Sequence, residues 1–278
     1  QKIVTFQRET DRPLSIAFLI DVSASEERTL PQEKAAARAF IETVMQSSKD
    51  QAAIVAFTGS AFLEQNLTRD VLSLYRALER VEVAMPTYLG AGRPISGIVS
   101  GPGMPAPPSP GTTAIWEAIT LTASEVLIAR PDQRDQIQRR RAIILLTDGW
   151  DTSSRVDRKD AINNALAAET IIYAIGIGDS KRYGIDKNGL YVVAASTGGR
   201  AFFPKTEIDL RNAFAEIERE LRSQYLITYS STNKIRDGGY RQMQIEVANP
   251  ELQKAKLQLR YRPGYFAKPL PAQTRTRE

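Results

Sequence analysis

Apolar and polar residues follow one another along this chain in blocks that fit strands and helices in turn. Short apolar runs bounded by polar turn residues predict buried strands at 14–21, 51–58, 142–147 and 170–177, with shorter strands at 62–67 and 200–203. Apolar residues at helical spacing predict helices at 30–47, 70–80, 113–129, 155–169, 188–196 and 208–222. This alternation indicates an α/β fold, with a doubly wound, mostly parallel sheet flanked by helices.

The pattern changes after Arg222. Strict alternation of apolar and polar residues predicts three further strands, at 224–231, 240–248 and 255–262, with 250–254 as a connection. Gln1–Arg8 alternates in the same way. We therefore expect a small antiparallel β-unit made of the C-terminal strands and the N-terminal strand. The predicted domains are a main domain at 12–223, the β-unit at 1–11 and 224–266, and a tail at 267–278.

The segment from Tyr88 to Gly111 interrupts this rhythm, because it is rich in proline and glycine and has no periodicity. A loop of this length inside a compact domain is unusual. It ends directly at Thr112-Thr113, so we expect it to project from the carboxyl edge of the sheet. It is either a disordered insertion or a segment that shapes a partner surface.

Polar motifs stand where two of the predicted strands end. Asp21-Val22-Ser23-Ala24-Ser25 closes the first strand, and Thr147-Asp148-Gly149 closes the strand at 142–147. The carboxyl edge of an open α/β sheet is where ligands bind. A carboxylate beside two hydroxyls suits a small hard cation such as Mg²⁺, although Asp and Ser are also ordinary turn residues.

Together with a threonine-led helix start, these motifs resemble the metal-ion-dependent adhesion site of von Willebrand factor type A domains. Thr113–Ile119 is similar to the family's T-A-L-Y-D-A-hydrophobic stretch, and Leu145–Ser153 to its L-L-[ST]-D-G-x-D-T-S stretch. Thr197–Pro204 is typical of bacterial members, particularly a group abundant in Acidobacteria. The resemblance covers roughly residues 12 to 225. It implies a site for Mg²⁺, or for Mn²⁺ or Ca²⁺, formed by Asp21, Ser23, Ser25, Thr113 and Asp148.

Only two of these five residues carry charge, so a divalent cation there would keep positive character and a position open to water. The resemblance implies that an Asp or Glu of a partner protein completes the coordination. The expected function is therefore metal-dependent protein binding, as an adhesion or scaffold module without catalysis. The resemblance also suggests an extracytoplasmic location, either periplasmic or secreted.

Four neighbouring residues allow more than one interpretation. For Asp151 a helix-entry cap is favoured over a role in orienting metal ligands. For Glu26 a solvated surface position is favoured over competition for the cation. Trp116 is expected to pack on a helix face, whereas Trp150 is a candidate anchor at a binding surface.

Two other functions remain open. A phosphatase of the haloacid-dehalogenase type would use Asp21 as nucleophile and Asp148 with Asp151 to hold Mg²⁺. Against it, Ser23 stands where that chemistry usually has a second acid. The other possibility is a structural scaffold with a vestigial metal site. Gly176-Ile177-Gly178-Asp179 resembles a dinucleotide loop but lacks its third glycine, so nucleotide binding is not predicted.

The composition of the chain excludes several classes of protein function. The chain of 278 residues has no cysteine and no histidine, which excludes serine–histidine–aspartate and cysteine–histidine catalysis within it. The net charge of +5 comes without a recognised nucleic-acid module, so no nucleic-acid partner is expected. No apolar run of about eighteen residues predicts a membrane span. No signal peptide is visible, because Gln1–Val4 already reads as structure.

Overall fold

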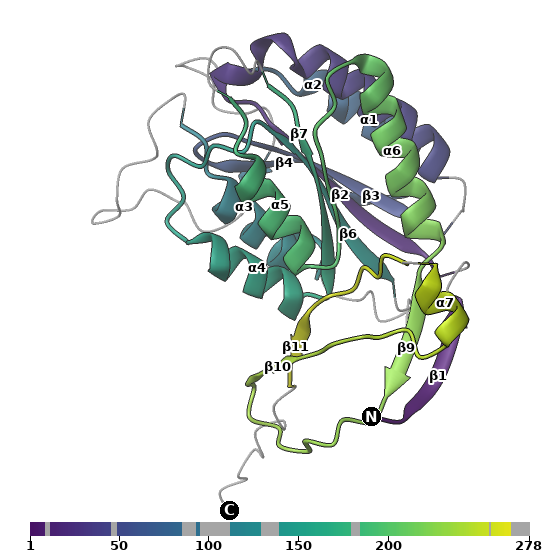
Figure 1. Ribbon diagram of the computed structural model, residues 1–278. Helices are drawn as coiled ribbons and strands as arrows, with labels where there is room; N and C mark the ends of the chain where they lie inside the picture. Colours follow the sequence, from purple (N-terminus) through teal and green to yellow (C-terminus); the bar gives the residue numbers. More distant parts are fainter. Residues whose placement is uncertain are drawn as a thin grey trace, which may run out of the picture.

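The computed structural model describes residues 1–8, 12–45, 49–84, 93–94, 112–128, 139–178, 184–255 and 257–267. Its centre is a seven-stranded sheet in the order β5-β4-β3-β2-β6-β7-β8 (Figure 1). The strands are β2 (Leu14–Asp21), β3 (Gln51–Phe57), β4 (Ala61–Thr68), β5 (Arg93–Pro94), β6 (Arg140–Thr147), β7 (Thr170–Gly176) and β8 (Ala201–Phe202). Only β4 and β5 introduce antiparallel pairs. The predicted α/β fold with a mostly parallel sheet is confirmed.

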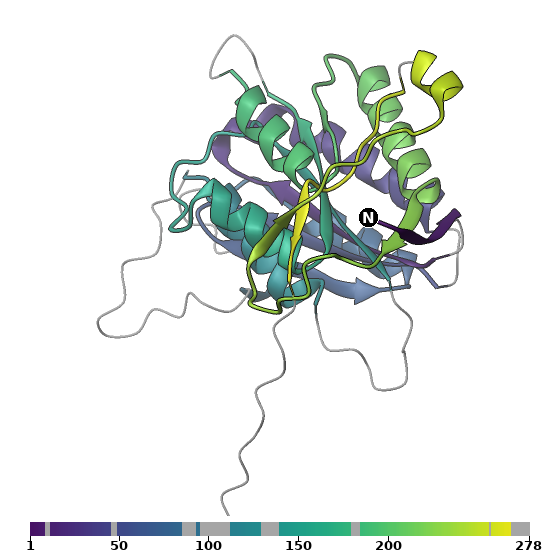
Figure 2. The ribbon, with the colours of Figure 1, turned by 60° about the horizontal axis from the view of Figure 1, so that its bottom comes forward.

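Helices cover both faces of this sheet (Figures 1 and 2). One face packs on α1 (Leu30–Val44), α2 (Val71–Arg80) and α6 (Glu207–Arg222), and the other on α3 (Ile115–Leu121), α4 (Arg158–Ala167) and α5 (Lys187–Ser196). Along β2, Ile16 and Phe18 join the first apolar cluster, whereas Ala17 and Leu19 join the second. Both faces of β2 are thus buried, which explains why its sequence is a continuous apolar run.

Phe40 on α1 connects three elements of the first cluster. Its ring lies 5.7 Å from that of Phe18 on β2 and 5.1 Å from that of Phe214 on α6, measured between centroids. We expect Phe40→Ala to lower the free energy of unfolding by about 3–5 kcal/mol, because it removes a buried ring and leaves a cavity. Urea unfolding followed by circular dichroism measures this. Leu72→Ala on the exposed face of α2 is the control, and an equal loss in both variants would contradict the prediction.

The first turn of α3 differs from the sequence prediction. A helix starting at Thr113 was expected, but α3 begins at Ile115, and Ala114 precedes it without a side-chain cap. Instead, Asp151 accepts a hydrogen bond from the Trp116 amide, at 3.1 Å. The cap therefore comes from a distant loop. After Leu121 the helix continues as a π-helical turn, Thr122–Val126.

The predicted β-unit is confirmed in part. β1 (Ile3–Arg8) pairs antiparallel with β9 (Tyr225–Tyr229), which follows α6 directly. A second antiparallel pair joins β10 (Tyr240–Gln242) to β11 (Gly264–Phe266). The two pairs meet through the rings of Tyr229 and Tyr265, whose centroids are 6.4 Å apart.

The strand predicted at 240–248 ends at Gln242, and the prediction was also wrong for residues 250–262. Pro250–Lys254 forms a short helix, α7, instead of a connection, because Asn249 accepts a hydrogen bond from the Glu251 amide and proline suits the first helical position. No strand forms over the described residues 257–262, where Leu257 and Leu259 are exposed. Alternation alone does not make a strand when no neighbouring strand supplies hydrogen bonds.

Two predicted regions lie almost wholly outside the described residues. Of the segment 88–111 only β5 is described, and of the tail 267–278 only Ala267. Within the described ranges, none of the helices combines the length and the apolar composition needed to span a bilayer.

Candidate metal site

The carboxyl ends of β2 and β6 lie side by side at the centre of the sheet. The two strands are parallel, and Ile20 pairs with Leu146. From β2 the sheet extends to β3 on one side and to β6 on the other. This is a topological switch point, where a crevice forms at the strand ends. The register brings Asp21 opposite Thr147, and Asp148 follows directly.

Asp21 is fully buried and oriented by two hydrogen bonds. The Thr147 hydroxyl donates to its Oδ2 at 2.5 Å, and the Ser23 amide donates to its Oδ1 at 2.9 Å. Burial raises the pKa of Asp21 to about 7, against the effect of these donors, and the charge of Asp148 adds to the increase. The fold therefore holds a carboxylate in fixed geometry where its charge is costly without a counterion.

Ser23 and Ser25 lie in the turn that follows Asp21. Their hydroxyl oxygens are 3.0 Å apart and share a hydrogen bond. Ser23 is buried, whereas Ser25 is exposed. The two hydroxyls therefore lie in the turn beyond the end of β2, with that of Ser23 in the interior and that of Ser25 at the surface.

Thr113 is buried and held between two strand ends. On the β3 side, the Thr58 hydroxyl donates to the Thr112 carbonyl at 2.7 Å, and the Ala114 amide donates to the Thr58 carbonyl at 2.8 Å. On the β6 side, the Thr113 amide donates to the Thr152 hydroxyl at 2.8 Å, and the Thr152 amide donates to the Thr113 carbonyl at 2.8 Å. These bonds tie the start of α3 to the loop that follows Asp148.

Asp148 begins that loop and is 5% exposed. Its Oδ1 accepts a hydrogen bond from the Trp150 amide at 3.1 Å. Gly149 between them has φ = 87°, a left-handed conformation that glycine adopts without steric cost, so it turns the chain sharply after the carboxylate. Trp150 is 49% exposed at the rim, whereas Trp116 is buried on α3, as its predicted packing role requires.

Glu26 is the residue that sequence reasoning misjudged. It was expected at a solvated surface, but it is 0% exposed. One oxygen each of Asp21, Glu26 and Asp148 lie within 4.8 Å of one another. Burial raises the pKa of Glu26, and the neighbouring charges of Glu33 and Asp21 add to the effect, so that the pKa is about 10. The only sequence signal that Glu26 belongs near the site was its position directly after the D-x-S-x-S motif.

Glu33 on α1 adds a fourth buried carboxyl close by. Neither of its oxygens has a well-formed hydrogen bond within the described residues, although Thr29 and Glu26 are near enough to lower its pKa somewhat. Burial dominates and raises the pKa of Glu33 to about 7, with the charges of Asp21 and Asp148 adding to the effect. Among the described residues, no Lys or Arg forms an ion pair with any of these four acids.

This arrangement fits a divalent cation. Opposite oxygen ligands of one Mg²⁺ or Ca²⁺ ion are separated by about 4–5 Å, twice the metal–oxygen distance. The oxygens of Asp21, Glu26 and Asp148 lie within that span. One Glu26 oxygen is buried without a hydrogen-bond partner, a state that costs free energy unless a cation compensates it. The structure brings Asp21 and Asp148 together, with Ser23 and Ser25 in the adjoining turn; the assignment of all five predicted ligands stays a prediction.

Asp151 does not belong to this cluster. Its Oδ2 accepts from the Trp116 amide and from the Ser154 hydroxyl, at 3.1 and 2.5 Å, and its Oδ1 accepts from the Ser154 amide at 3.1 Å. Its favoured interpretation as a cap therefore fits, although it caps α3 and not the helix that follows it. The phosphatase alternative required Asp151 beside Asp148 as a magnesium ligand, and these hydrogen bonds engage both of its oxygens elsewhere.

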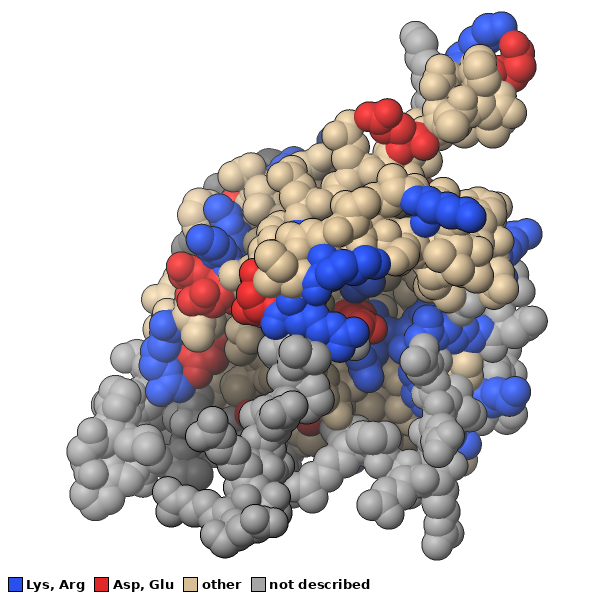
Figure 3. Space-filling view, turned by 90° about the horizontal axis from the view of Figure 1, so that it is seen from below, with Lys and Arg blue, Asp and Glu red and all other residues tan. Residues whose placement is uncertain are grey.

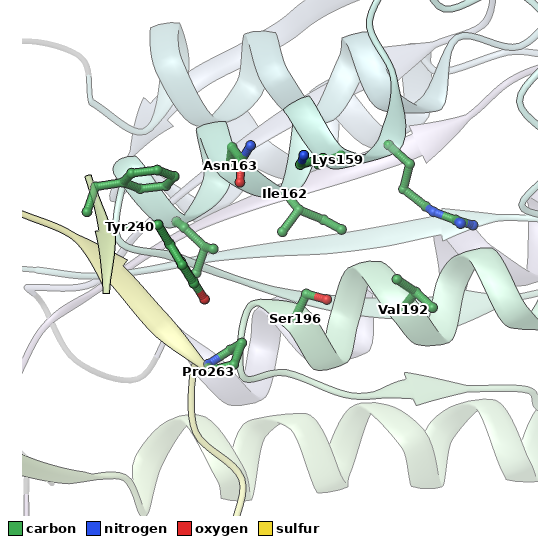
Figure 4. Close-up of a pocket in the computed structure, with 10 residues that line it drawn as sticks. Lys159, Ile162, Asn163, Val192, Ser196, Tyr240 and Pro263 are labelled. Carbon is green, nitrogen blue, oxygen red and sulfur yellow. The ribbon is translucent and has the colours of Figure 1, made fainter. Parts of the chain in front are cut away.

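A separate cleft of about 510 Å³ lies between α4, α5 and the β10–β11 pair (Figure 4). Ile162 and Val192 form its apolar floor, Tyr240 and Pro263 flank it, and Lys159 stands at its edge. None of the five predicted metal ligands lines it.

Lys and Arg side chains are numerous on the lower face of the molecule, with Asp and Glu among them (Figure 3). Several arginines in the second half of the chain form ion pairs with acidic side chains. Arg222 contacts the buried Asp50 at 2.6 Å, Arg260 contacts Glu220 at 2.6 Å, and Arg241 contacts Asp237 at 2.7 Å. The pairs of Arg260 and Arg241 are ordinary surface ion pairs, whereas Arg222 compensates a buried acid.

Several solved structures share this fold. Proximal thread matrix protein 1 from the mussel byssus is 18% identical with a TM-score of 0.57, and the match covers 80% of this chain and 49% of that protein. A form of the same mussel protein with a zinc-occupied MIDAS motif is 19% identical with a TM-score of 0.56, at the same coverage of 80% and 49%. BatB from Bacteroides thetaiotaomicron is 18% identical with a TM-score of 0.53, over 76% of this chain and 100% of BatB.

The chain thus spans about half the length of the mussel protein, and these low identities show the fold alone. No curated protein sequence matches the chain. Two family models match it, both for the von Willebrand factor type A domain, one over residues 16–96 and the other over residues 105–216. Together the matched segments run from β2 into α6 and contain the strand ends described above. The chain belongs to the von Willebrand factor type A domain family.

Proposed function

We propose that this protein is a divalent-metal-dependent protein-binding module. Asp21, Ser23, Ser25, Thr113 and Asp148 would hold Mg²⁺, or Mn²⁺ or Ca²⁺, and a partner protein would present an Asp or Glu. The observation that supports this best is the buried cluster of carboxylate oxygens at the switch point, which has no basic partner within the described residues. Its oxygen donors suit hard divalent cations.

The chain's own contribution is to hold these donors in place before the ion arrives. The Thr147 hydroxyl and the Ser23 amide orient Asp21, and the Trp150 amide orients Asp148. The bound cation supplies a positive charge at the surface of the domain. Two unit charges about 4 Å apart attract by roughly 1 kcal/mol in water and roughly 4 kcal/mol at an effective dielectric of 20. A carboxylate of a partner protein that excludes water from the site is therefore attracted to the cation more strongly than a carboxylate that stays surrounded by water.

The surroundings are consistent with a protein partner. Trp150 is half exposed beside Asp148 and offers an apolar contact next to the charged one. The bacterial, Acidobacteria-type group that the sequence resembles suggests an extracytoplasmic site of action. The phosphatase alternative has less support, because Asp151 is engaged at the α3 start. The vestigial-scaffold alternative differs in one measurable respect: it requires no cation affinity.

Affinity capture in Mg²⁺ and in chelator tests the proposal. The immobilised protein should retain a specific partner from an extract of its source in Mg²⁺, and release it into chelator. Asp148→Asn should retain none, because it removes one of the two charged ligands. Asp160→Asn is the matched control, since Asp160 is an exposed acid on α4. Retention of the same partner in chelator, or by Asp148→Asn, would contradict metal-dependent binding.

A further inference from the structure

The inference concerns Glu26 and rests on the proposed metal site. Glu26 lies outside the five predicted ligands, yet its side chain is buried against two of them. It belongs to a short 3₁₀ helix, Ala24–Arg28, that begins immediately after Ser23. The Glu26 amide donates to the Ser23 carbonyl at 3.0 Å, so the turn that carries the serines also sets the position of Glu26.

The two oxygens of Glu26 have different environments. The Thr29 hydroxyl donates to Oε2, while Oε1 is buried and has no hydrogen-bond partner. A Glu26 oxygen lies within 4.8 Å of oxygens of both Asp21 and Asp148. Three carboxylates that converge in this way are unfavourable when all are ionised, and a shared divalent cation is the simplest group that compensates their charges together.

The charge count changes with Glu26 included. Asp21 and Asp148 alone balance the two formal charges of a divalent cation, which still attracts a further carboxylate at a coordination position that water would otherwise fill. Addition of Glu26 makes three carboxylates around two positive charges, a net negative site. An acidic side chain that approaches such a site is repelled, because like charges at close range disfavour association.

We propose that Glu26 is a third carboxylate ligand of the metal, supplied from within the chain, and that it occupies the position that a partner's acidic side chain would take. In this arrangement, an ion at the site would be liganded by the chain itself. A partner carboxylate binds the ion only when Glu26 moves away from it. The 3₁₀ turn 24–28 is the element that has to move, and it is short and precedes α1 directly.

Calorimetric titration of the metal-free protein with Mn²⁺ tests the ligand role. Glu26→Gln is expected to weaken Mn²⁺ binding by about tenfold or more, because ligand charge count sets affinity in such sites. Glu27→Gln is the matched control, since Glu27 is the exposed neighbour on the same turn; it should stay within about twofold of the unmodified protein.

Thermal unfolding separates a ligand from a structural residue. If Glu26 is a ligand, Glu26→Gln raises the melting temperature in chelator, because a neutral amide replaces an acid that is buried without a cation, and the variant shows a smaller rise in melting temperature on addition of Mn²⁺. If Glu26 serves only through its bond to Thr29, the variant loses stability in chelator and keeps the full gain. The second result would overturn the proposal.

Water-proton relaxation with bound Mn²⁺ tests the competition, with acetate as the probe carboxylate. At saturating Mn²⁺, Glu26→Gln should show more exchangeable inner water, and acetate should displace that water at lower concentration than in the unmodified protein. Equal water and equal acetate response would overturn the self-liganded site. If the unmodified protein binds Mn²⁺ and Asp21→Asn does not, while Glu26→Gln binds unchanged, the metal site stands and only the role of Glu26 fails. If the unmodified protein binds no Mn²⁺, both fail.

Discussion

Asp21→Asn will bind Mg²⁺ and Mn²⁺ about a hundredfold or more weakly than the unmodified protein, a loss of at least about 2.7 kcal/mol. Asp21 is the buried carboxylate at the end of the central strand, oriented by Thr147 and by the Ser23 amide. Asparagine keeps the shape and the oxygen that accepts from Ser23, but it removes the charge. Isothermal titration calorimetry in metal-free buffer measures the change.

The fold should survive this substitution. In the metal-free protein Asp21 is a buried acid with no Lys or Arg partner among the described residues, so replacing it with a neutral amide leaves circular dichroism unchanged and does not lower the melting temperature in chelator. Asp160→Asn on α4 removes an exposed acid and should bind both ions normally. Unchanged ion affinity in Asp21→Asn would exclude the strand-end cluster as the metal site.

The metal-free protein will lose thermal stability as the pH rises from about 5 to about 8. Burial raises the pKa of Asp21 and of Glu33 to about 7 and that of Glu26 to about 10. A carboxyl with a raised pKa in the folded state stabilises the fold fully below its unfolded pKa near 4, and this contribution is lost as the pH rises through the folded pKa. At about 1.4 kcal/mol per pKa unit, the loss from these carboxyls amounts to several kcal/mol.

Scanning fluorimetry in chelator at constant ionic strength measures the slope of melting temperature against pH. The pKa values of the exposed Asp70, Asp209 and Asp237 are lowered by hydrogen bonds, so their contributions are lost only as the pH falls toward the acid range, outside the window chosen. Excess Mg²⁺ should flatten the slope, because the ion compensates the ionised carboxylates. In chelator, Glu33→Gln should make the decrease of melting temperature with pH smaller. A melting temperature that rises between pH 5 and pH 8 in chelator would contradict the prediction.

Local sequence determined most of the sheet and the position of two acids, Asp21 and Asp148, at its carboxyl edge. The continuous apolar run of β2 predicts a strand buried on both faces, and Asp21, at its end, falls at the carboxyl edge for that reason. Asp148 follows β6 by the same logic, and Asp70 precedes α2 as a typical N-cap, whose side chain accepts from the Leu72 amide. These features depend on neighbours within a few residues, which is the range over which pattern and propensity act.

Tertiary structure alone decided the features that join distant segments. The stretch Ala24–Arg28 is polar and reads as a solvated turn, but contact with Asp148 after β6 and with Glu33 on α1 buries Glu26 completely. Likewise, Asp151 caps α3 across the gap between two loops, and β10 pairs with β11 where alternation had favoured residues 255–262. Burial and hydrogen-bond partners are properties of the assembled fold, because they depend on which surfaces meet in space.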